Sequence, residues 1–473
     1  MSSQRSRVAS GSVANAVQMG LGFVSIVAFS RLLGPEAIGV YFFVLAVVST
    51  ADGLLNGLVM AVGKRIPEVD SNVPELLGVL TYGLLPATVA FSALVAAVLF
   101  LTGAAAGDTA LFIFLVFTPF VASAAGVRAI IGLERVDLAR WLEAARTVLR
   151  IALQFALIVL GFGVVGMVVG YTLAMVVAAV GALVVMQVLP RLPSRETLDS
   201  VWDFARYSIP GGVVSRLDES ADEMLMGLLF VSATVGDYGV AVRLVAPALL
   251  VPSVIQGSLS ARLSRLESQG KPVAAVLRRN LAFSAVLAMP LFFGALAIGN
   301  QVVVTVFGSE FSGAGPFLVI LAASRVVKAW SSPMTSAVAG LDHPRAVLVI
   351  NTISAATMVG GGLLLAVLVG PVGIALGILG AMVVRWLACV VVLTEYASLR
   401  DLLPVQIGEQ LAAGATMYLL VVWLAGWLVT SWQTVILAVG LGGMAYGLVL
   451  LAVSTETRRA ATEMTTRISG WDA

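Results

Sequence analysis

Long apolar stretches run through nearly the whole chain, and they constrain its fold more than any other feature of the sequence. A helix that spans a bilayer needs about 20 mainly apolar residues. Stretches of that length recur about fourteen times, so the sequence predicts an all-α polytopic membrane protein with about 14 transmembrane helices. The predicted spans cover residues 11–33, 38–62, 76–102, 109–132, 138–160, 163–188, 204–230, 236–261, 273–299, 314–340, 345–369, 371–394, 403–428 and 432–454.

Composition points to the same class of fold. Hydrophobic residues make up 59% of the 473 residues and charged residues only 11%, whereas roughly a quarter of the residues in a soluble domain are charged. Most of the surface is therefore expected to face lipid. The net charge of +2 and the scattered basic residues give no indication of nucleic-acid binding. The single cysteine, Cys389, excludes an intramolecular disulfide, and the single histidine, His343, excludes a histidine metal cluster.

Basic residues gather in alternate connections between the predicted spans. This pattern follows the positive-inside rule if the N-terminus lies in the cytoplasm. The predicted inner segments carry Arg5, Arg7, Lys64, Arg65, Arg135, Arg140, Arg191, Arg195, Arg262, Arg265, Lys271, Arg278, Arg279, Arg345, Arg400, Arg458, Arg459 and Arg467. The predicted outer loops hold little beyond Arg31. We therefore expect a multi-pass protein of the cell membrane with both termini in the cytoplasm.

Two halves of the chain resemble each other at an offset of about 200 residues. The Gly-Leu-Glu-Arg sequence at 132–135 recurs as Gly-Leu-Asp-His at 340–343, and the glycine spacing of 165–170 recurs at 372–377. An even number of spans in each half predicts two pseudo-symmetric six-helix lobes around a central cavity, as in many transporters. The expected division is 1–190 for the N-lobe (spans 1–6), 191–396 for the C-lobe (spans 7–12), and 397–473 for spans 13–14 and a short cytoplasmic tail. The alternative is that glycine spacings that favour helix packing recur by chance.

Charged residues interrupt the seventh predicted span more than any other. Arg216, Glu219 and Glu223 share one helical face. Asp218 and Asp222 lie beside that face. Ionisable residues at membrane depth are unfavourable toward lipid and usually face a cavity or a partner. Four carboxylates within two turns therefore indicate a water-lined cavity.

Other predicted spans carry single polar or charged residues: Asp52, Asn56, Arg128, Glu143, Arg146, Arg150, Arg243, Gln256, Arg325, Lys328, Asn351 and Arg385. Each has an alternative explanation that involves no ligand. Arg150, Lys328 and Arg385 could extend to the membrane interface while their stems stay in lipid. Arg146 could form a structural ion pair with Glu143.

Four stretches of the chain resemble polysaccharide flippases of the Wzx type, which belong to the multidrug/oligosaccharidyl-lipid/polysaccharide exporter superfamily. They are Ser30–Tyr41 (SRLLGPEAIGVY), Arg128–Asp137 (RAIIGLERVD), Ala339–Arg345 (AGLDHPR) and Val369–Gly377 (VGPVGIALG). The resemblance covers nearly the whole chain and rests on glycine spacing. It implies a transporter, with no catalytic residues and no cofactor, that moves a polyprenyl-(pyro)phosphate-linked oligosaccharide to the outer leaflet by alternating access. The partners it implies are the lipid-linked glycan and the bilayer, with the protein acting as a monomer near glycosyltransferases or a polymerase.

The resemblance also implies roles for the charged residues. Basic residues of the cavity would bind the substrate phosphate, and the acidic residues would couple ions or balance charge. The candidate substrate-binding residues are Arg128, Arg146, Arg216, Arg243, Arg325 and Lys328. The candidate ion-coupling or charge-balancing residues are Asp52, Asp218, Glu219, Asp222, Glu223 and Asn351. In some relatives the seventh helix helps bind sodium, which makes Asp222 and Asn351 candidates for Na⁺, although Ala355 stands where those relatives have a carboxylate. The coupling ion, Na⁺ or H⁺, stays open.

Two other functions fit parts of the sequence. A cation-coupled multidrug exporter of the same superfamily would share the fold, but arginines at cavity depth would repel cationic drugs. A membrane glycan polymerase or ligase would need an acid, a base or a metal on a large outer loop, and no predicted outer loop is long enough.

Overall fold

A computed structural model of the chain describes residues 2–68, 71–428, 431–459 and 462, with side chains from residue 20 onward except 427–428. Within these residues every regular element is helical. The side chains of Arg5 and Arg7, and Arg467 with the rest of the predicted tail from 463, lie outside the described part. The chain divides into two compact units, Met1–Gly239 and Val240–Ala473.

The first unit contains α1 (Ser2–Arg65), α2 (Val73–Gly78), the π-helical turn η1 (Val79–Leu84), α3 (Leu85–Leu101), α4 (Gly107–Gly132), α5 (Val136–Leu157), the π-helical turn η2 (Ile158–Phe162), α6 (Gly163–Met186), α7 (Arg195–Leu229) and the start of α8 (Ser232–Val245). The second contains the end of α8, the 3₁₀ turn η3 (Ala246–Leu249), α9 (Leu250–Ser268), α10 (Ala274–Ser284), α11 (Ala288–Phe307), the 3₁₀ turn η4 (Ser309–Phe311), α12 (Ala314–Gly340), α13 (Pro344–Ala356), the π-helical turn η5 (Thr357–Gly361), α14 (Gly362–Val369), α15 (Val372–Leu393), α16 (Leu399–Leu402), α17 (Gln406–Leu428) and α18 (Trp432–Val453).

Eleven helical stretches of the described chain are long and apolar enough to cross a membrane. Two of them contain 46 and 51 residues, about twice the length that a bilayer core requires. The first is broken at Gly34, with φ of 76° ahead of Pro35, and the second at Gly161 and Gly163, with φ of 91° and 54°. The first break falls between two predicted spans, and the second lies at the junction of the predicted spans 138–160 and 163–188. Helix α7, which is too charged to count among the eleven, corresponds to the seventh predicted span. The all-α polytopic fold is confirmed, and the number of fourteen spans stays a prediction.

The two halves of the chain share unusual backbone conformations. Glu134 after α4 and Asp342 after α12 both have positive φ, 62° and 58°. Gly370, with φ of 71°, separates α14 from α15 in the same way that Gly161 and Gly163 separate α5 from α6. Left-handed conformations are uncommon for residues other than glycine, so their recurrence at equivalent places supports the internal repeat.

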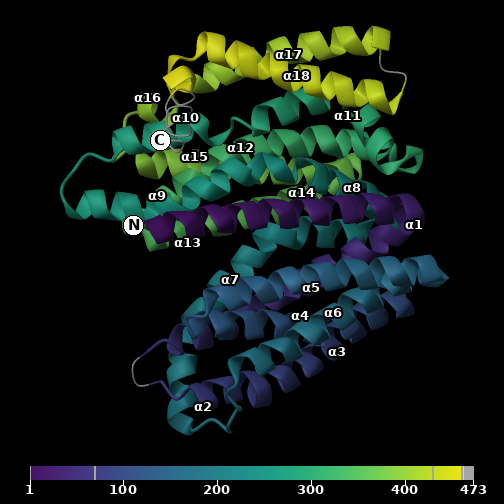
Figure 1. Cartoon of the computed structure of the whole chain (residues 1–473), viewed down its shortest axis with the longest axis vertical. Coiled ribbons are helices and arrows are strands. Elements are labelled where there is room, and N and C mark those ends of the chain that lie inside the picture. The colour runs from purple at the N-terminus through teal and green to yellow at the C-terminus, as the bar shows by residue number, and fades with distance from the viewer. Residues whose placement is uncertain (1, 69–70, 429–430, 460–461, 463–473) are drawn as a thin grey trace. The chain divides into compact units, whose positions relative to one another are not determined.

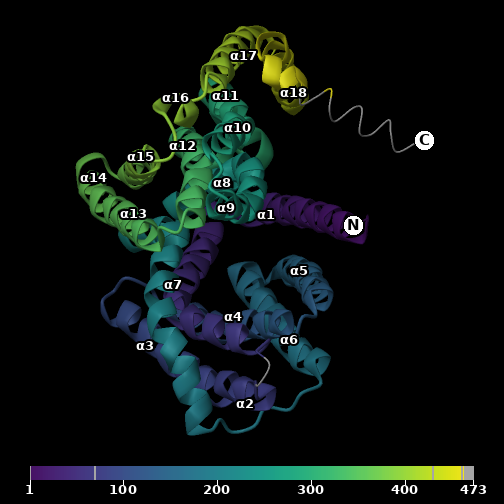
Figure 2. The same cartoon turned by 90° about the vertical axis from the view of Figure 1, so that its left-hand side faces the viewer.

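In the first unit, α1 and α7 pack against each other (Figure 2). Glycines line their contact, so the two backbones approach closely. A Cβ atom on Gly212 of α7 would lie 2.7 Å from the carbonyl oxygen of Gly53 on α1. Ser208 Oγ of α7 donates a hydrogen bond of 2.9 Å to the carbonyl oxygen of Gly57. Small residues let membrane helices approach closely, and this approach places the charged face of α7 beside α1.

In the second unit, two apolar cores hold the helices together. One contains Leu263, Leu277, Leu341 and Leu393, and so joins one end of α9, α10, α12 and α15. The other packs α11 and α12 against α17 and α18, which lie side by side as a hairpin (Figure 1). The lobe boundaries expected at residues 190 and 396 follow pseudo-symmetry rather than compactness, and they stay predictions.

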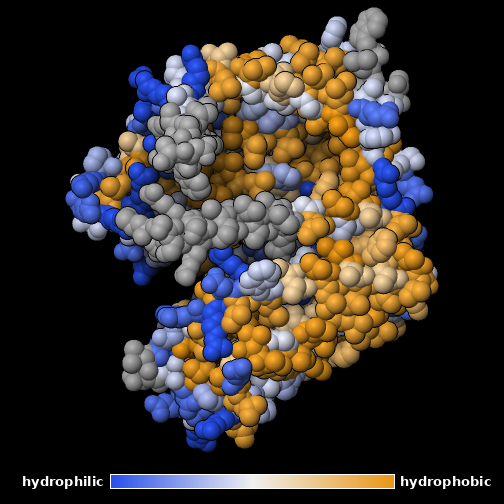
Figure 3. All heavy atoms as spheres, viewed as in Figure 1, coloured by the Kyte–Doolittle hydropathy of each residue, from blue (hydrophilic) through white to orange (hydrophobic). Residues whose placement is uncertain are grey.

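Apolar side chains cover the flanks of the helices, and hydrophilic side chains gather near helix ends (Figure 3). Exposed residues such as Leu101, Leu160, Val367 and Val391 are 81%, 71%, 85% and 70% accessible. Exposed apolar surface of this extent is what lipid contact requires.

Candidate functional site

A cavity of about 340 Å³ lies within the first unit, among α1, α4, α5, α6 and α7. Its lining is unusually rich in arginine for the inside of a membrane protein. The residues that line it are Asn56, Val59, Phe120, Ala124, Val127, Arg128, Ile131, Glu143, Arg146, Thr147, Arg150, Tyr171, Met175 and Arg216. Four arginines thus face a single carboxylate, a lining charge of +3.

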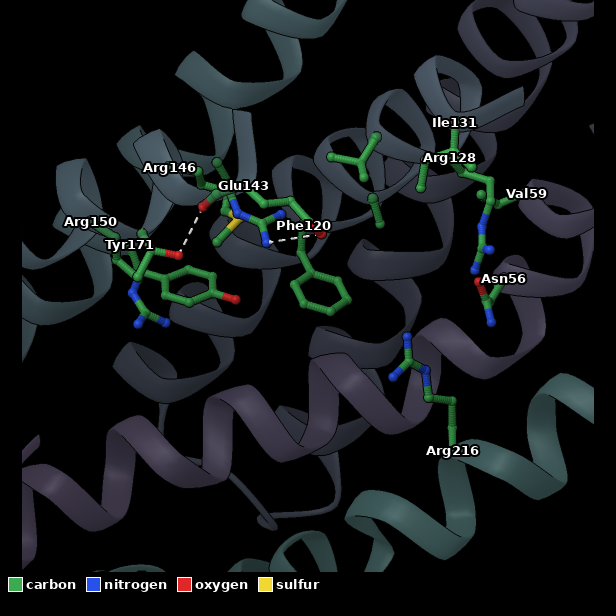
Figure 4. A pocket seen from close by; sticks show the side chains of 14 residues that line it. Asn56, Val59, Phe120, Arg128, Ile131, Glu143, Arg146, Arg150, Tyr171 and Arg216 are labelled. Carbon is green, nitrogen blue, oxygen red and sulfur yellow. Dashed lines mark hydrogen bonds and ion pairs between the residues drawn. The ribbon is translucent and has the colours of Figure 1, made fainter. Parts of the chain in front are cut away.

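Arg128 comes from the penultimate turn of α4 and lies opposite Gly63 of α1. A Cβ atom at Gly63 would lie 2.6 Å from Cγ of Arg128, so the glycine makes room for the arginine stem. The guanidinium group of Arg128 points toward Asn56 (Figure 4). No ion pair or side-chain hydrogen bond to Arg128 exists within the described residues, so this cation is available to a ligand.

Arg146 and Arg150 lie one turn apart on the cavity face of α5. Arg146 donates a hydrogen bond of 3.1 Å to Ser123 Oγ and lies 4.0 Å from Oε1 of Glu143. Arg150 lies over the ring of Tyr171, 5.9 Å from its centroid. Cation–π contact of this kind positions a guanidinium without neutralising it. Nε of Arg150 is buried and has no hydrogen-bond partner in the described structure.

Arg216 reaches the cavity from α7 and is held by two carboxylates. Its Nη2 lies 3.1 Å from Oδ2 of Asp52 on α1, and its Nη1 lies 3.0 Å from Oε2 of Glu219 one turn along α7. Asp52 is 2% exposed and Glu219 is 52% exposed. One partner is therefore fixed inside the protein, while the other can exchange with water or with an incoming anion.

The cavity brings together three of the predicted substrate-binding residues, Arg128, Arg146 and Arg216. Arg146 also forms the ion pair with Glu143 that was considered as its alternative. The other three predicted basic residues, Arg243 on α8 and Arg325 and Lys328 on α12, belong to the second unit. Their convergence on one chamber with the first three, and their binding of substrate, stay predictions.

The predicted acidic residues divide in a similar way. Asp52 and Glu219 balance the charge of Arg216. Asp222 is buried and accepts a hydrogen bond of 2.6 Å from the hydroxyl of Tyr238. Asp218 and Glu223 lie on α7 and do not line the cavity.

The proposed sodium ligands lie in different units, Asp222 in the first and Asn351, on α13, in the second. Their role in ion coupling stays a prediction. Within the described residues, no group of three or more His, Cys, Asp or Glu side chains is arranged to hold a metal ion.

Most of the lining residues were not among the predicted site residues, and Arg150 and its partner Tyr171 are the most informative of them. Arg150 had the interface as its alternative, yet it lines the cavity; its spacing of four from Arg146 was the signal that could have identified it. Tyr171 lies in an apolar stretch of α6, and nothing in its neighbourhood marks it as an arginine partner. Arg385, which shared the interface alternative, is only 5% exposed and is buried within its own unit.

A family model of polysaccharide biosynthesis proteins matches residues 28–316 of the chain. The chain belongs to the polysaccharide biosynthesis protein family. Over 338 residues it is 25% identical to the "Probable low-salt glycan biosynthesis flippase Agl15" of Haloferax volcanii, a match that covers 70% of this chain and 71% of the relative.

Solved structures show the same fold. The lipid II flippase MurJ in an inward closed conformation superposes with a TM-score of 0.75 at 13% identity and covers 93% of this chain and 98% of MurJ. An inward-facing multidrug resistance MATE transporter of the MOP superfamily gives a TM-score of 0.60 at 19% identity and covers 80% of this chain and 94% of that protein. The family match and the Haloferax relative confirm the resemblance to polysaccharide flippases of the Wzx type. The solved structures confirm the polytopic membrane fold.

Proposed function

We propose that the protein is a flippase that moves a polyprenyl-(pyro)phosphate-linked oligosaccharide from the cytoplasmic to the outer leaflet by alternating access, for surface polysaccharide synthesis or protein glycosylation. The observation that carries this proposal is the cavity with four arginines, one of which has no protein partner in the described structure. The family match and the name of the Haloferax relative support the same substrate class.

The physical task is to carry a hydrated anionic head group across about 30 Å of hydrocarbon while its lipid tail stays in the bilayer. An unpaired charge would be far too unfavourable at that depth. Arginines solve this problem because the planar guanidinium donates two parallel hydrogen bonds to phosphate oxygens and stays charged. Arg128 and Arg150 offer such donors without a competing carboxylate, and Arg146 and Arg216 add charge on either side.

Glu219 gives the cavity a way to respond to substrate. When the cavity is empty, Glu219 and Asp52 together hold Arg216. A phosphate group would displace the exposed Glu219 more readily than the buried Asp52, because the exposed ion pair contributes little to stability. Substrate binding would then loosen a contact within α7 and leave the contact between α7 and α1 intact.

The cavity favours a glycan flippase over the alternatives. A transporter for cationic drugs would need a lining that attracts cations, and a lining of four arginines and one glutamate repels them. A polymerase or ligase is disfavoured because the Haloferax relative is named as a probable flippase. We therefore propose a transporter and not an enzyme.

We further propose that the protein resides in the cytoplasmic membrane with both termini inside, working as a monomer near glycosyltransferases or a polymerase. In the second unit, the end that carries Arg278, Arg400 and Arg459 is strongly basic, whereas the opposite end carries Glu310. This asymmetry supports the orientation through the positive-inside rule.

Lipid analysis of cells that lack the protein tests the function. Accumulation of one lipid-linked oligosaccharide in the cytoplasmic leaflet, reversed by the wild-type gene and not by the Arg128→Ala variant of the cavity, is the expected result. Unchanged lipids together with altered efflux of a cationic dye would contradict the flippase proposal and support a drug exporter.

A further inference from the structure

A second basic pocket, of about 260 Å³, lies in the unit 240–473 and is separate from the arginine-lined cavity of the first unit. It is formed by α10, by the first residue of α17 and by the segment that follows α18. Its lining residues are Ala275, Arg278, Arg279, Ala282, Phe283, Gln406, Glu456 and Arg459. Three arginines face one carboxylate, and the transport mechanism proposed above uses none of them.

The pocket's positive charge is only partly balanced by the protein. The guanidinium groups of Arg278 and Arg459 have no ion pair and no hydrogen bond within the part of the chain that the structure describes. Both residues are exposed. Two arginines held beside one cavity without a salt bridge repel each other, so an anion bound between them would be favourable.

The pocket lies where apolar helices give way to polar connections. Phe283 and Ala282 belong to the apolar stretch Ala274–Phe307, and α18 ends at Val453, shortly before Glu456. The pocket therefore combines the apolar side chains of Ala275, Ala282 and Phe283 with cationic ones. A phospholipid at this depth matches both parts, because its acyl chains can contact the apolar side chains and its phosphate can contact the arginines.

The surrounding surface is also basic. The helix ends joined by the core around Leu277 and Leu341 carry exposed cations outside the pocket. These are Arg262, Arg265, Lys271, Arg345, Arg400 and Arg458. They attract anionic lipid to this end in general, and the pocket supplies a specific place for one head group.

We propose that this pocket binds the phosphate group of an anionic phospholipid from the leaflet that this end of the unit meets. The guanidinium groups of Arg278 and Arg459 donate hydrogen bonds to the phosphate oxygens, and the amide of Gln406 forms a hydrogen bond with a head-group hydroxyl. The bound lipid joins α10, α17 and the segment after α18. Gln410 already fixes α17 to α10 through a buried hydrogen bond of 2.7 Å from Nε2 to the carbonyl oxygen of Ala282, so the lipid stabilises the attachment of the α17–α18 hairpin.

The test uses the full-length protein in a neutral detergent. The midpoint of thermal unfolding is measured against the concentration of phosphatidylglycerol, of phosphatidylcholine and of inorganic phosphate. We expect phosphatidylglycerol to raise the midpoint and the other two to have little effect. R278Q/R459Q is expected to weaken the apparent affinity for phosphatidylglycerol about thirty-fold, since a neutral glutamine in place of each arginine exchanges a charged hydrogen bond to the phosphate for a weaker neutral one, roughly one five-fold step at each position.

R262Q/R265Q on α9 is the matched control, because it removes the same charge from the same end outside the pocket; it is expected to keep its affinity within about three-fold. Equal loss in both double variants would overturn the proposal in favour of general attraction. If inorganic phosphate raises the unfolding midpoint as much as phosphatidylglycerol does, the ligand is a soluble anion and the lipid proposal is overturned. If R278Q/R459Q does not fold, the single variants R278Q and R459Q, each expected to lose about five-fold, decide the same question.

Discussion

Arg216 on α7 and Asp52 on α1 form an ion pair of 3.1 Å across 164 residues of sequence. The carboxylate is buried and the guanidinium is a quarter exposed, with 2% and 26% of each side chain accessible. Taking charges out of water is unfavourable unless they are paired. Each of the two residues therefore compensates the desolvation of the other. The pair also fixes Arg216 so that it faces the cavity.

Asp52→Asn tests whether this pair stabilises the fold. The amide keeps the shape of the side chain but leaves Arg216 with Glu219 alone, and we expect the free energy of unfolding to fall by about 1–3 kcal/mol. Glu219→Gln is the control and should change it by less than about 1 kcal/mol, because that pair is exposed. Thermal unfolding of both purified variants in detergent measures the difference. Equal destabilisation would mean that burial does not distinguish the two contacts.

Arg128→Ala tests the arginine that has no protein partner in the described structure. Since no ion pair or side-chain hydrogen bond within the described protein is lost and Arg128 is exposed, stability should stay within about 0.5 kcal/mol of the wild type. Transport should fall about ten- to a hundred-fold, the effect of removing one charged hydrogen bond to substrate. Uptake of a lipid-linked oligosaccharide analogue in reconstituted vesicles measures the rate. Arg140→Ala, an exposed position of α5 outside the cavity, is the control and should transport normally.

Much of the fold was predictable because membrane spans are encoded locally. The predicted span 314–340 coincides with α12, and the predicted boundary after residue 33 coincides with the break at Gly34. Length and apolarity determine a span, and glycine or proline determines its end. No partner distant in sequence is needed for either.

The site was predictable only where its contacts are local. The ion pair between Arg216 and Glu219 follows from a spacing of three on one helix. The contact between Arg216 and Asp52, and that between Arg150 and Tyr171, depend on how helices pack. That packing is set by glycines on α1 and α7, whose role as contact points a single sequence does not reveal.

Tyr171→Leu tests the positioning of Arg150. Leucine preserves an apolar side chain and removes the aromatic face, so a cation–π contact of about 0.5–2 kcal/mol is lost. We expect the substrate concentration at half-maximal transport to rise about two- to thirty-fold. Tyr171→Phe keeps the ring and should behave like the wild type. A defect in the phenylalanine variant as large as that in the leucine variant would assign the role to the hydroxyl instead.

The membrane potential should drive transport if the head group crosses as a net anion. An inside-negative potential of 100 mV favours outward movement of a charge near −2 by about 4.6 kcal/mol. In vesicles with an imposed potential, substrate should therefore accumulate in the leaflet on the positive side of the membrane. An ionophore that collapses the potential should slow this movement. Transport that is unaffected by the ionophore would show that the cavity cations travel with the substrate or that a coupling ion supplies the energy.

Adjacent glycines on α7 allow the packing of α1 and α7 to be tested with a matched pair of substitutions. In Gly212→Ala the new Cβ atom would lie 2.7 Å from the carbonyl oxygen of Gly53, so the two helices must separate. In Gly211→Ala the Cβ atom meets nothing within 4 Å. We expect the first to destabilise the protein by about 1–3 kcal/mol. The second should be neutral or stabilising by up to about 1 kcal/mol, because alanine favours a helix more than glycine does.

The variants Gly212→Ala and Gly211→Ala should also differ in transport rate. Displacement of α7 from α1 lengthens the contact between Arg216 and Asp52, so Gly212→Ala should reduce the transport rate even at temperatures where the variant stays folded. Gly211→Ala should transport at the wild-type rate. Thermal unfolding and vesicle transport of both variants provide the measurements. A Gly212→Ala variant that is as stable and as active as Gly211→Ala would mean that close approach of the two helices does not hold Arg216 in the cavity.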